Sequence, residues 1–261
     1  MAQIGDRSDL WIRRVGRTVR EDAPVRLVCF PHAGGAAPFY HPLAAAVGEA
    51  AEVLAVQYPG RQDRRDEPAC VSIAELADRV HEEIQAWTDR PLVFFGHSMG
   101  AVVSYEVARR MQRQGDHNPL GLIVSGRRAP CLPSVERNIH LRGDVGLIDE
   151  LRRQNGTASS LLEDEEVVRM ILPSLRGDYR AIETYRHQEG LELTCPITGL
   201  TGDEDPGATV EQVAAWENHT HAAFEMRVFP GGHFYLSEQW DAVGAAVRDC
   251  LTAFARPVAT H

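Results

Sequence analysis

Pro91-Leu-Val-Phe-Phe-Gly-His-Ser-Met-Gly100 joins a short apolar run to the pattern Gly-x-Ser-x-Gly. Residues 92–95 are typical of a buried strand, and the apolar positions of residues 101–111 form one face of a helix. A sharp turn from strand to helix brings neighbouring backbone close, so the flanking glycines leave the room that side chains would need. Such a turn lifts a serine hydroxyl above the end of the strand. Ser98 is therefore the candidate nucleophile.

The composition limits the class of protein. The chain has 261 residues, of which 44% are hydrophobic, so it can bury one large core and we expect a single domain over residues 1–261. A formal net charge of -10 without a Lys/Arg-rich run argues against nucleic acid as a partner. Five widely spaced cysteines predict reduced thiols and no metal site. The polar N-terminus and the lack of a long apolar run predict a cytoplasmic protein with no membrane partner, and we expect a monomer.

Apolar runs and helical patterns alternate along the chain. The expected strands cover residues 11–15, 25–30, 52–57, 92–95, 120–125, 196–201 and 224–229. Helices are expected at residues 39–48 and 72–87, the second with a capping box made by Ser72 and Glu75. This alternation predicts an α/β fold with a mostly parallel central sheet and helices on both faces.

The alternation breaks between about residues 127 and 190. This segment has helical patterns at residues 145–154 and 165–185 but no strand, and Gly156-Thr-Ala-Ser-Ser160 is typical of a flexible joint. Such an insertion would lie over the nucleophile as a helical lid. Its apolar side chains either pack against the body or line an acyl pocket; they are Leu147, Ile148, Leu151, Val167, Met170, Ile171 and Leu175.

The candidate acid and base follow the last two strands. Gly202-Asp-Glu-Asp-Pro206 offers two carboxylates just past a strand. We prefer Asp205, because the turn would present the second acid to the site and leave Asp203 on a surface loop. His233 lies in a glycine-flanked loop after the last strand and can reach back over the nucleophile. The chain order Ser98, Asp205, His233 is the order that α/β-hydrolases use.

Other histidines fit the role of base less well. His32 lies beside a glycine turn, where a histidine more often orients or packs than transfers a proton. His219 and His221 fall at a helix end, and we expect them to face solvent.

An oxyanion site needs backbone N–H donors. In α/β-hydrolases the residue after the nucleophile supplies one, and the loop after an early strand supplies another. Met99 and Ala33 are the candidates, the second within Pro31-His-Ala-Gly-Gly35. A plain Gly-Gly turn between strand and helix is the alternative for this loop.

Arg61, Arg64 and Arg65 form the densest positive cluster of an acidic chain. They are either a solvated loop that pairs with its own Asp63 and Asp66 or a docking patch for an acidic partner.

Five motifs together resemble those of type II thioesterases, the free-standing editing enzymes of polyketide and nonribosomal peptide synthesis. They are Pro31-His-Ala-Gly-Gly35, Tyr58-Pro-Gly-Arg-Gln-Asp-Arg64, Gly96-His-Ser-Met-Gly100, Gly202-Asp-Glu-Asp-Pro206 and Gly231-Gly-His-Phe-Tyr235. The resemblance runs from about Trp11 to Phe254, with Tyr235 standing where the family often has another aromatic residue.

This resemblance implies an α/β-hydrolase fold with a helical lid, which hydrolyses acyl groups from the phosphopantetheine arm of acyl or peptidyl carrier proteins. It implies a triad of Ser98, Asp205 and His233 and an oxyanion hole formed by the Ala33 and Met99 amides. No cofactor is expected, since phosphopantetheine belongs to the carrier. The arginine cluster would then be a candidate carrier-docking patch.

Two alternatives stay open at this point. A general carboxylesterase or lipase acting on free oxoesters would use the same three residues, because a triad does not choose between sulfur and oxygen. A non-catalytic α/β-hydrolase that binds a ligand is the alternative outside enzymes, and such proteins commonly lack a triad member.

Overall fold

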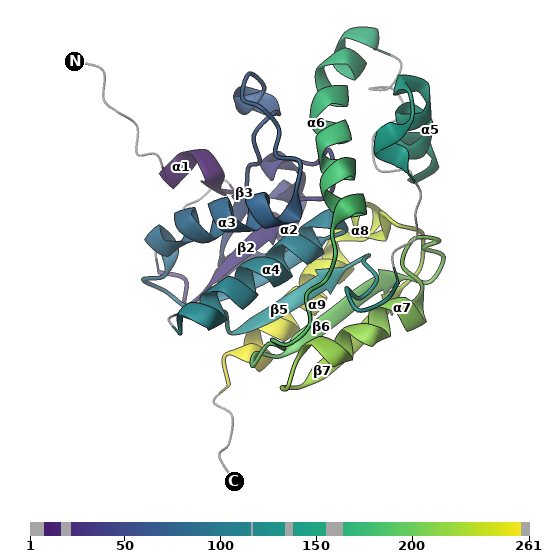
Figure 1. Ribbon diagram of the computed structural model, residues 1–261. Coiled ribbons are helices and arrows are strands. Elements are labelled where there is room, and N and C mark those ends of the chain that lie inside the picture. Colours follow the sequence, from purple (N-terminus) through teal and green to yellow (C-terminus); the bar gives the residue numbers. More distant parts are fainter. Residues whose placement is uncertain (1–7, 17–21, 116, 134–137, 155–163, 257–261) are drawn as a thin grey trace, which may run out of the picture.

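A seven-stranded sheet organises the computed structural model, which describes residues 8–16, 22–115, 117–133, 138–154 and 164–256 (Figure 1). The strand order is β1-β3-β2-β4-β5-β6-β7. The strands are β1 (Ile12–Arg14), β2 (Arg26–Phe30), β3 (Glu52–Val56), β4 (Leu92–His97), β5 (Gly121–Ser125), β6 (Ile197–Gly202) and β7 (Phe224–Phe229). Only the β1–β3 pair among them is antiparallel. The prediction of a mostly parallel sheet is confirmed.

Helices cover both faces of the sheet. The helices of the described residues are α1 (Ser8–Trp11), α2 (His41–Val47), α3 (Ile73–Ile84), α4 (Met99–Gln114), α5 (Asp144–Gln154), α6 (Glu165–Thr184), α7 (Val210–Ala214), α8 (Tyr235–Glu238) and α9 (Trp240–Phe254). Short 3-10 turns are η1 (Ala37–Tyr40), η2 (Gly48–Ala50), η3 (Gln62–Arg64), η4 (Gln85–Trp87), η5 (Ile139–Leu141) and η7 (Ala215–His219). In the described part of the chain, no helix has the length and apolar character needed to cross a membrane.

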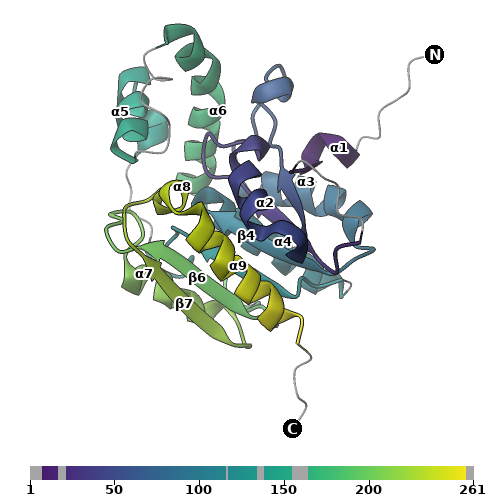
Figure 2. The same cartoon turned by 180° about the vertical axis from the view of Figure 1, so that it is seen from behind.

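The period-two pattern of the strands divides the core into two layers. In β2, Val28 and Phe30 belong to the apolar cluster beneath α3 and α4, whereas Leu27 and Cys29 belong to the cluster beneath α2 and α9. Figures 1 and 2 show these two helix pairs on opposite faces. Because both faces are covered, β2 to β6 are buried at every position and mostly apolar, as expected for a buried parallel sheet.

The insertion between β5 and β6 carries α5 and α6, which rise above the carboxyl ends of the strands (Figure 1). Helix α6 begins after Asp164, whose side chain accepts hydrogen bonds from the N–H groups of Glu166 and Val167. The observed helices match the predicted ranges within one residue at each end. The predicted flexible joint, residues 156–160, lies outside the described residues.

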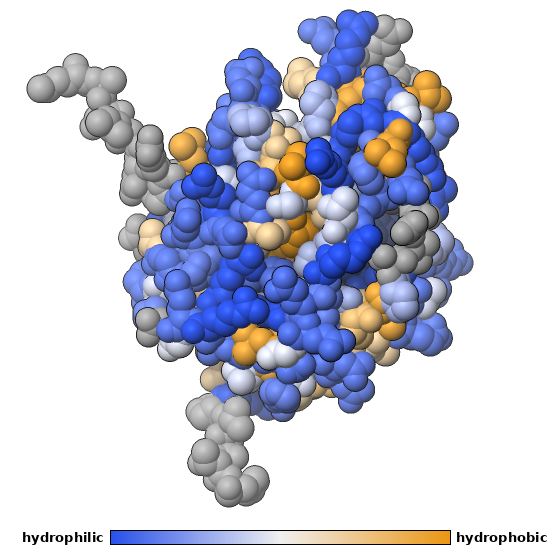
Figure 3. All heavy atoms as spheres, in the orientation of Figure 1, coloured by the Kyte–Doolittle hydropathy of each residue, from blue (hydrophilic) through white to orange (hydrophobic). Residues whose placement is uncertain are grey.

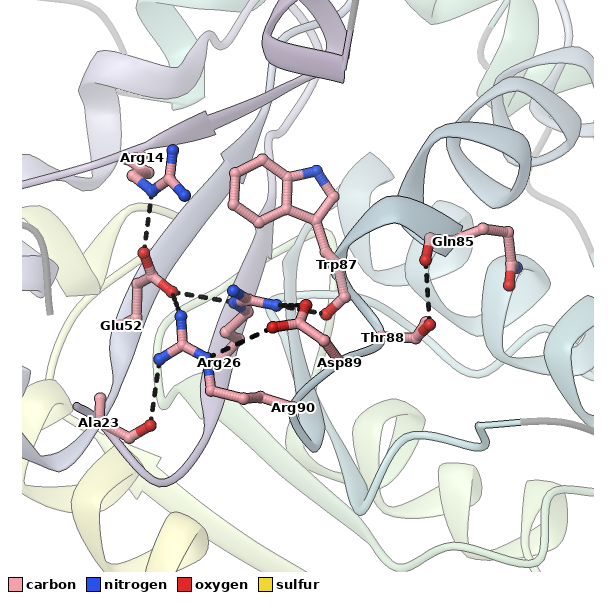
Figure 4. Close-up of polar contacts among 9 residues, drawn as sticks. All are labelled: Arg14, Ala23, Arg26, Glu52, Gln85, Trp87, Thr88, Asp89 and Arg90. Atoms are coloured by element: carbon pink, nitrogen blue, oxygen red, sulfur yellow. Dashed lines mark hydrogen bonds and ion pairs between the residues drawn. The ribbon is translucent and has the colours of Figure 1, made fainter. Parts of the chain in front are cut away.

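An ionic cluster holds the opposite, amino end of β2 and β3 (Figure 4). Glu52 is almost fully buried and accepts hydrogen bonds from Arg14 Nε at 3.0 Å and Arg26 Nε at 2.9 Å, and it also pairs with Arg90. Arg26 donates in turn to the carbonyl of Trp87 at 2.7 Å. The amino end of the sheet is thus fixed by charge, while the carboxyl end carries the loops of the candidate site.

Candidate active site

Ser98 is the one residue that connects β4 to α4, and its backbone has φ +54° and ψ -116°. A residue with a side chain rarely adopts a positive φ, so the packing around the turn must hold it there. A Cβ at Gly96 would lie 2.4 Å from the Gly100 carbonyl oxygen, and one at Gly100 would lie 2.0 Å from the Phe30 carbonyl oxygen. The glycines therefore have the role that the sequence predicts, which is to let strand, helix and a neighbouring strand approach around the serine.

The three residues predicted as nucleophile, acid and base meet at the carboxyl end of the sheet. His233 Nε2 lies 2.9 Å from Ser98 Oγ, and His233 Nδ1 lies 2.7 Å from Asp205 Oδ2. A carboxylate can only accept, so we infer that Nδ1 carries the proton and that Nε2 is free to accept from the serine hydroxyl. The other Asp205 oxygen, Oδ1, accepts from the N–H of Gly207 at 2.8 Å, which fixes the carboxylate.

Asp203 has a different position from Asp205. Its Oδ1 accepts from the Gly231 N–H at 2.8 Å and so holds the loop that presents His233. The two loops approach closely, since a Cβ at Gly202 would lie 2.1 Å from the Gly231 carbonyl oxygen. The Asp203 carboxylate thus joins two loops and does not reach the histidine ring.

Two further buried histidines pack around His233. The ring of His97 lies 5.1 Å from that of His233 and 5.8 Å from that of His32, measured between centroids. Burial, followed by the charges of His233 and Arg61, lowers the pKa of His32 to about 3. Burial also lowers the pKa of His97 well below its ordinary value. Both rings are neutral at physiological pH, so His32 has the packing position that the sequence favours.

The loop after β2 approaches the serine with its backbone. Ala33 and Met99 both line the cavity in which Ser98 lies. Met99 is the first residue of α4, where a backbone N–H has no partner within the helix. The residue after Ala33, Gly34, donates its N–H to Asp178 Oδ2 at 2.7 Å. Residues 31–35, the predicted oxyanion loop, are therefore tied to the insertion, because Asp178 lies on α6.

A family model described as a thioesterase domain matches residues 25–253. The chain belongs to the thioesterase family. The "Probable cadicidin biosynthesis thioesterase" of Streptomyces griseus is 49% identical over 246 residues, which are 94% of this chain and 67% of that protein. "Thioesterase PikA5" of Streptomyces venezuelae is 45% identical over 245 residues, covering 94% and 86% of the two chains. The predicted resemblance is thus confirmed, and the chain is a thioester hydrolase.

A solved structure gives the same result. The type II thioesterase BorB from the borrelidin biosynthetic cluster matches with a TM-score of 0.86 and 47% identity, covering 93% of this chain and 98% of the other. This agreement confirms the predicted α/β-hydrolase fold.

Arg61 and Arg64 of the thioesterase do not form the predicted docking patch. Both are buried, 7% and 5% exposed. Arg61 makes a two-pronged ion pair with Asp178, with Nη1–Oδ2 and Nη2–Oδ1 distances of 2.7 and 2.8 Å, and Nη1 also donates to the Gly35 carbonyl at 3.0 Å. The prediction is wrong for these two arginines, because their guanidinium groups are used inside the protein.

Arg64 and Arg65 differ although they are adjacent. Arg64 donates to the Gln57 carbonyl at 2.7 Å and pairs with Glu67, so its charge is engaged by the same loop. Arg65 alone of the three predicted arginines is exposed. The sequence did contain a signal for the Arg61 partner, because Asp178 falls on the apolar face of the predicted helix 165–185.

A cavity of about 780 Å³ opens above Ser98 in the thioesterase and is covered by the insertion. Tyr179 and Ile182 of α6 and Val102 of α4 supply apolar parts of its wall. None of the seven apolar insertion residues named from the sequence lines it. Five of the seven, Leu147 among them, lie in the core or pack against it, so packing is the better interpretation for these five. Met170 is 51% exposed and fits neither alternative. On the face shown in Figure 3, hydrophobic side chains gather where the insertion meets the body.

One histidine expected at the surface is buried instead. His219 is 2% exposed; its Nδ1 lies 3.1 Å from the Tyr105 hydroxyl, and its Nε2 accepts from the Cys131 N–H at 3.3 Å. The prediction that it faces solvent was wrong, because a short 3-10 turn rotates it inward. His221 is exposed, as predicted. Within the described ranges, no three potential metal-ligand side chains are grouped.

Proposed function

We propose that this thioesterase removes aberrant or stalled acyl groups from the phosphopantetheine arm of acyl or peptidyl carrier proteins in polyketide or nonribosomal peptide synthesis. The Streptomyces griseus relative and BorB are described as thioesterases of a biosynthesis and of a biosynthetic cluster, which supports a carrier protein as partner. The observation that carries the mechanism is the hydrogen-bonded series Ser98–His233–Asp205 at the base of a roomy cavity.

In the proposed first step, Ser98 Oγ attacks the thioester carbonyl carbon while His233 Nε2 takes the hydroxyl proton. Asp205 holds the Nδ1–H and stabilises the imidazolium that forms. The oxyanion would lie against the Ala33 and Met99 amides, each of which contributes on the order of 3 kcal/mol to lowering the barrier. The C–S bond then breaks, and the leaving thiolate takes the proton from His233. A thiol such as that of cysteine has a pKa of about 8.5, far below that of an alcohol, so a thiolate leaves more easily than an alkoxide.

In the proposed second step, His233 Nε2 takes a proton from a water molecule that attacks the ester carbonyl of acyl-Ser98. The tetrahedral intermediate collapses, the C–O bond to the serine breaks, and His233 returns the proton to Ser98 Oγ. The products are the free acid and the regenerated enzyme. In both steps His233 accepts each proton and then gives it up, so no other acid or base is needed.

The test presents one acyl group in three forms: on a phosphopantetheinylated carrier protein, on a small thiol, and as an oxoester. We expect the highest kcat/KM with the carrier, because protein docking would add to recognition of the acyl group. Equal kcat/KM for all three forms would contradict the editing function and indicate a general esterase. Labelling of Ser98 by a fluorophosphonate checks in the same experiment that the preparation is active.

A further inference from the structure

Two adjacent arginines line the active-site cavity, and no described residue forms an ion pair or a hydrogen bond with their guanidinium groups. Arg127 and Arg128 follow Gly126, directly after β5, and both are half-buried. Their Nε atoms are buried without a hydrogen-bond partner, and across the described residues no ion pair or hydrogen bond engages either guanidinium. Buried arginines in proteins are almost always paired, so two unpaired neighbours are an energetically unfavourable arrangement that folding alone does not explain.

The two charges also act on one another. Burial, followed by the adjacent charge of Arg128, lowers the pKa of Arg127 to about 10. The group therefore stays positive at physiological pH, but it is held in a place that disfavours its charge. An anion between the two guanidinium groups would remove this penalty, because it would pair with both cations at once.

The backbone of this segment is held from the side of the β6–β7 connection. Trp216 Nε1 donates to the Arg127 carbonyl at 2.7 Å, and the Ala129 N–H donates to the Gln212 carbonyl at 3.0 Å. The bond from Cys131 N–H to His219 Nε2, described above, adds a third attachment. The arginine pair is therefore mounted on a fixed frame, and a rigid mounting reduces the entropy that a ligand must overcome on binding.

Five carboxylate side chains line the cavity, those of Glu183, Glu189, Glu204, Asp205 and Glu238. Among the described residues none of them forms an ion pair with Arg127 or Arg128, and two are engaged elsewhere. Glu183 accepts from the N–H groups of Ile139 at 2.9 Å and His140 at 3.0 Å. Asp205 is bound to His233 and Gly207, as described above. Arg186 provides a contrast on the same wall, because its Nη1 donates to the carbonyls of Glu183 and Tyr185, both at 2.9 Å. Arg153, also on the wall, pairs with Glu150, so in the described part of the chain the cavity is lined by two arginines with partners and two without.

We propose that Arg127 and Arg128 form an anion-binding subsite that receives an oxyanion-bearing group of the substrate inside the active-site cavity. Two parts of a carrier-bound acyl thioester have this chemistry: the phosphodiester of the phosphopantetheine arm and a carboxylate on the acyl group. Both match the paired, planar donors of arginine. The inference rests on the proposed function, since it names the part of that substrate which the subsite recognises.

The test measures what each added anion contributes to kcat/KM. One arm compares the same acyl group on pantetheine and on 4′-phosphopantetheine. The other compares butyryl and succinyl thioesters of N-acetylcysteamine, which have equal chain length and differ by a carboxylate. Each ratio is measured for wild type, Arg127→Met, Arg128→Met and the control Arg186→Met. Because each ratio is taken within one protein, the fraction of folded enzyme cancels.

We expect one of the two anions to raise the wild-type kcat/KM by about tenfold or more, the effect of a charge-assisted hydrogen bond. Arg127→Met and Arg128→Met should each remove most of this gain, and Arg186→Met should keep it. The arm in which kcat/KM rises shows whether the subsite receives the phosphate or the carboxylate. Arg127→Lys and Arg128→Lys keep the charge but lose the planar pair of donors, so each should lose part of the gain in kcat/KM. These variants replace the Met variants if the Met variants do not fold.

Calorimetry of Ser98→Ala protein gives a readout independent of turnover when it compares pantetheine with 4′-phosphopantetheine and the butyryl with the succinyl thioester. In each arm the anion should tighten binding if the subsite receives it. No gain from either anion in wild type, or the full gain in every arginine variant, would overturn the subsite while hydrolysis of the pantetheine thioester still supports the proposed function. Failure of wild type to cleave any thioester would overturn the proposed function instead, and calorimetry would then decide the subsite alone.

Discussion

The hydroxyl of Ser98 owes its exposure to a backbone conformation that only dense packing can hold, with φ at +54°. Ser98→Ala removes the Oγ but leaves the turn and its glycines in place, so the fold should persist. We expect the kcat for thioester hydrolysis to fall by about 10⁶, to the level supported by the remaining oxyanion donors. Steady-state kinetics and thermal unfolding check both parts. Substantial hydrolysis by a pure Ser98→Ala preparation would remove Ser98 from the mechanism.

Two aspartates that are two positions apart provide a matched pair of variants. Asp205→Asn leaves His233 Nδ1 opposite an amide that can donate, which favours the wrong ring tautomer, and kcat should fall by roughly 10⁴. Asp203→Asn keeps an oxygen that can accept from the Gly231 N–H, so its effect on kcat should stay below about tenfold. Kinetics of the two proteins at one pH decide between the acids. A larger loss in Asp203→Asn would show that the acid had been chosen wrongly.

What the sequence could predict at this scale depends on how local the signal is. Ser98 and the glycines around it are defined by five consecutive residues, and Asp205 and His233 by short turns after strands. The environment of Arg61 depends on Asp178, which is 117 positions away. Burial of a charged side chain by a distant partner leaves little trace in its own neighbourhood, so the exposed interpretation was the natural one and was wrong.

At the scale of elements, the Asp178 carboxylate joins α6 to the predicted oxyanion loop, residues 31–35. Asp178 binds Arg61 with both oxygens and also accepts from the Gly34 N–H, next to the Ala33 amide. Asp178→Asn cannot satisfy both groups, and it leaves the Arg61 charge buried. We expect a stability loss of about 3 kcal/mol. We also expect a fall in kcat of about tenfold to a hundredfold, because one oxyanion donor is misplaced.

The affinity for a transition-state mimic separates the effect of Asp178 on the position of the oxyanion donor from its effect on stability. A boronic acid that adds to Ser98 should lose affinity in Asp178→Asn in proportion to kcat, while KM changes little. Glu52→Gln is the matched control, since it breaks a buried ion cluster at the far end of the sheet and should lower stability without changing kcat. Equal kcat in wild type and Asp178→Asn, with only stability reduced, would limit the carboxylate to a structural role.

The elements themselves were predictable where periodicity and caps are strong. Helices α5 and α6 match the predicted ranges, and β2 to β6 follow from apolar runs that a sheet covered on both faces requires. The position of α6 against the oxyanion loop was not predictable, because tertiary contacts and not helix periodicity determine where an insertion packs. The same limit applies to the cavity wall, where Tyr179 and Ile182 line the site and the predicted apolar residues do not.

At the scale of the whole molecule, the sheet separates a reactive end from a stabilising end. The carboxyl ends of the strands present Ser98, Asp205 and His233, as open α/β sheets commonly do for their ligands. The amino ends hold Glu52 among Arg14, Arg26 and Arg90 (Figure 4). Changes at one end should therefore alter stability with little effect on chemistry at the other.

The ionic cluster predicts how stability depends on pH. Burial alone would raise the pKa of Glu52, but hydrogen bonds from Arg26 and Arg14 and the charges of Arg90 and Arg26 outweigh it and hold the pKa below the ordinary 4.5. The unfolded chain therefore takes up this proton at a higher pH than the folded protein does. The contribution of Glu52 is present above about pH 4.5, and it is lost as the pH falls through the folded pKa.

Glu52→Gln cannot titrate, so its comparison with wild type isolates this contribution. Urea unfolding at neutral pH should show the variant less stable by about 2 kcal/mol, because Arg26 and Arg90 lose the carboxylate that they share while Asp89 still pairs with Arg26. The difference in the free energy of unfolding should narrow as the pH is lowered below about 4.5. Other carboxylates titrate equally in both proteins and cancel in the difference. The difference in the free energy of unfolding between the two proteins could instead stay constant down to the pH at which both unfold. The arginines would then not hold the Glu52 carboxyl ionised, and another interaction would have to fix the amino end of the sheet.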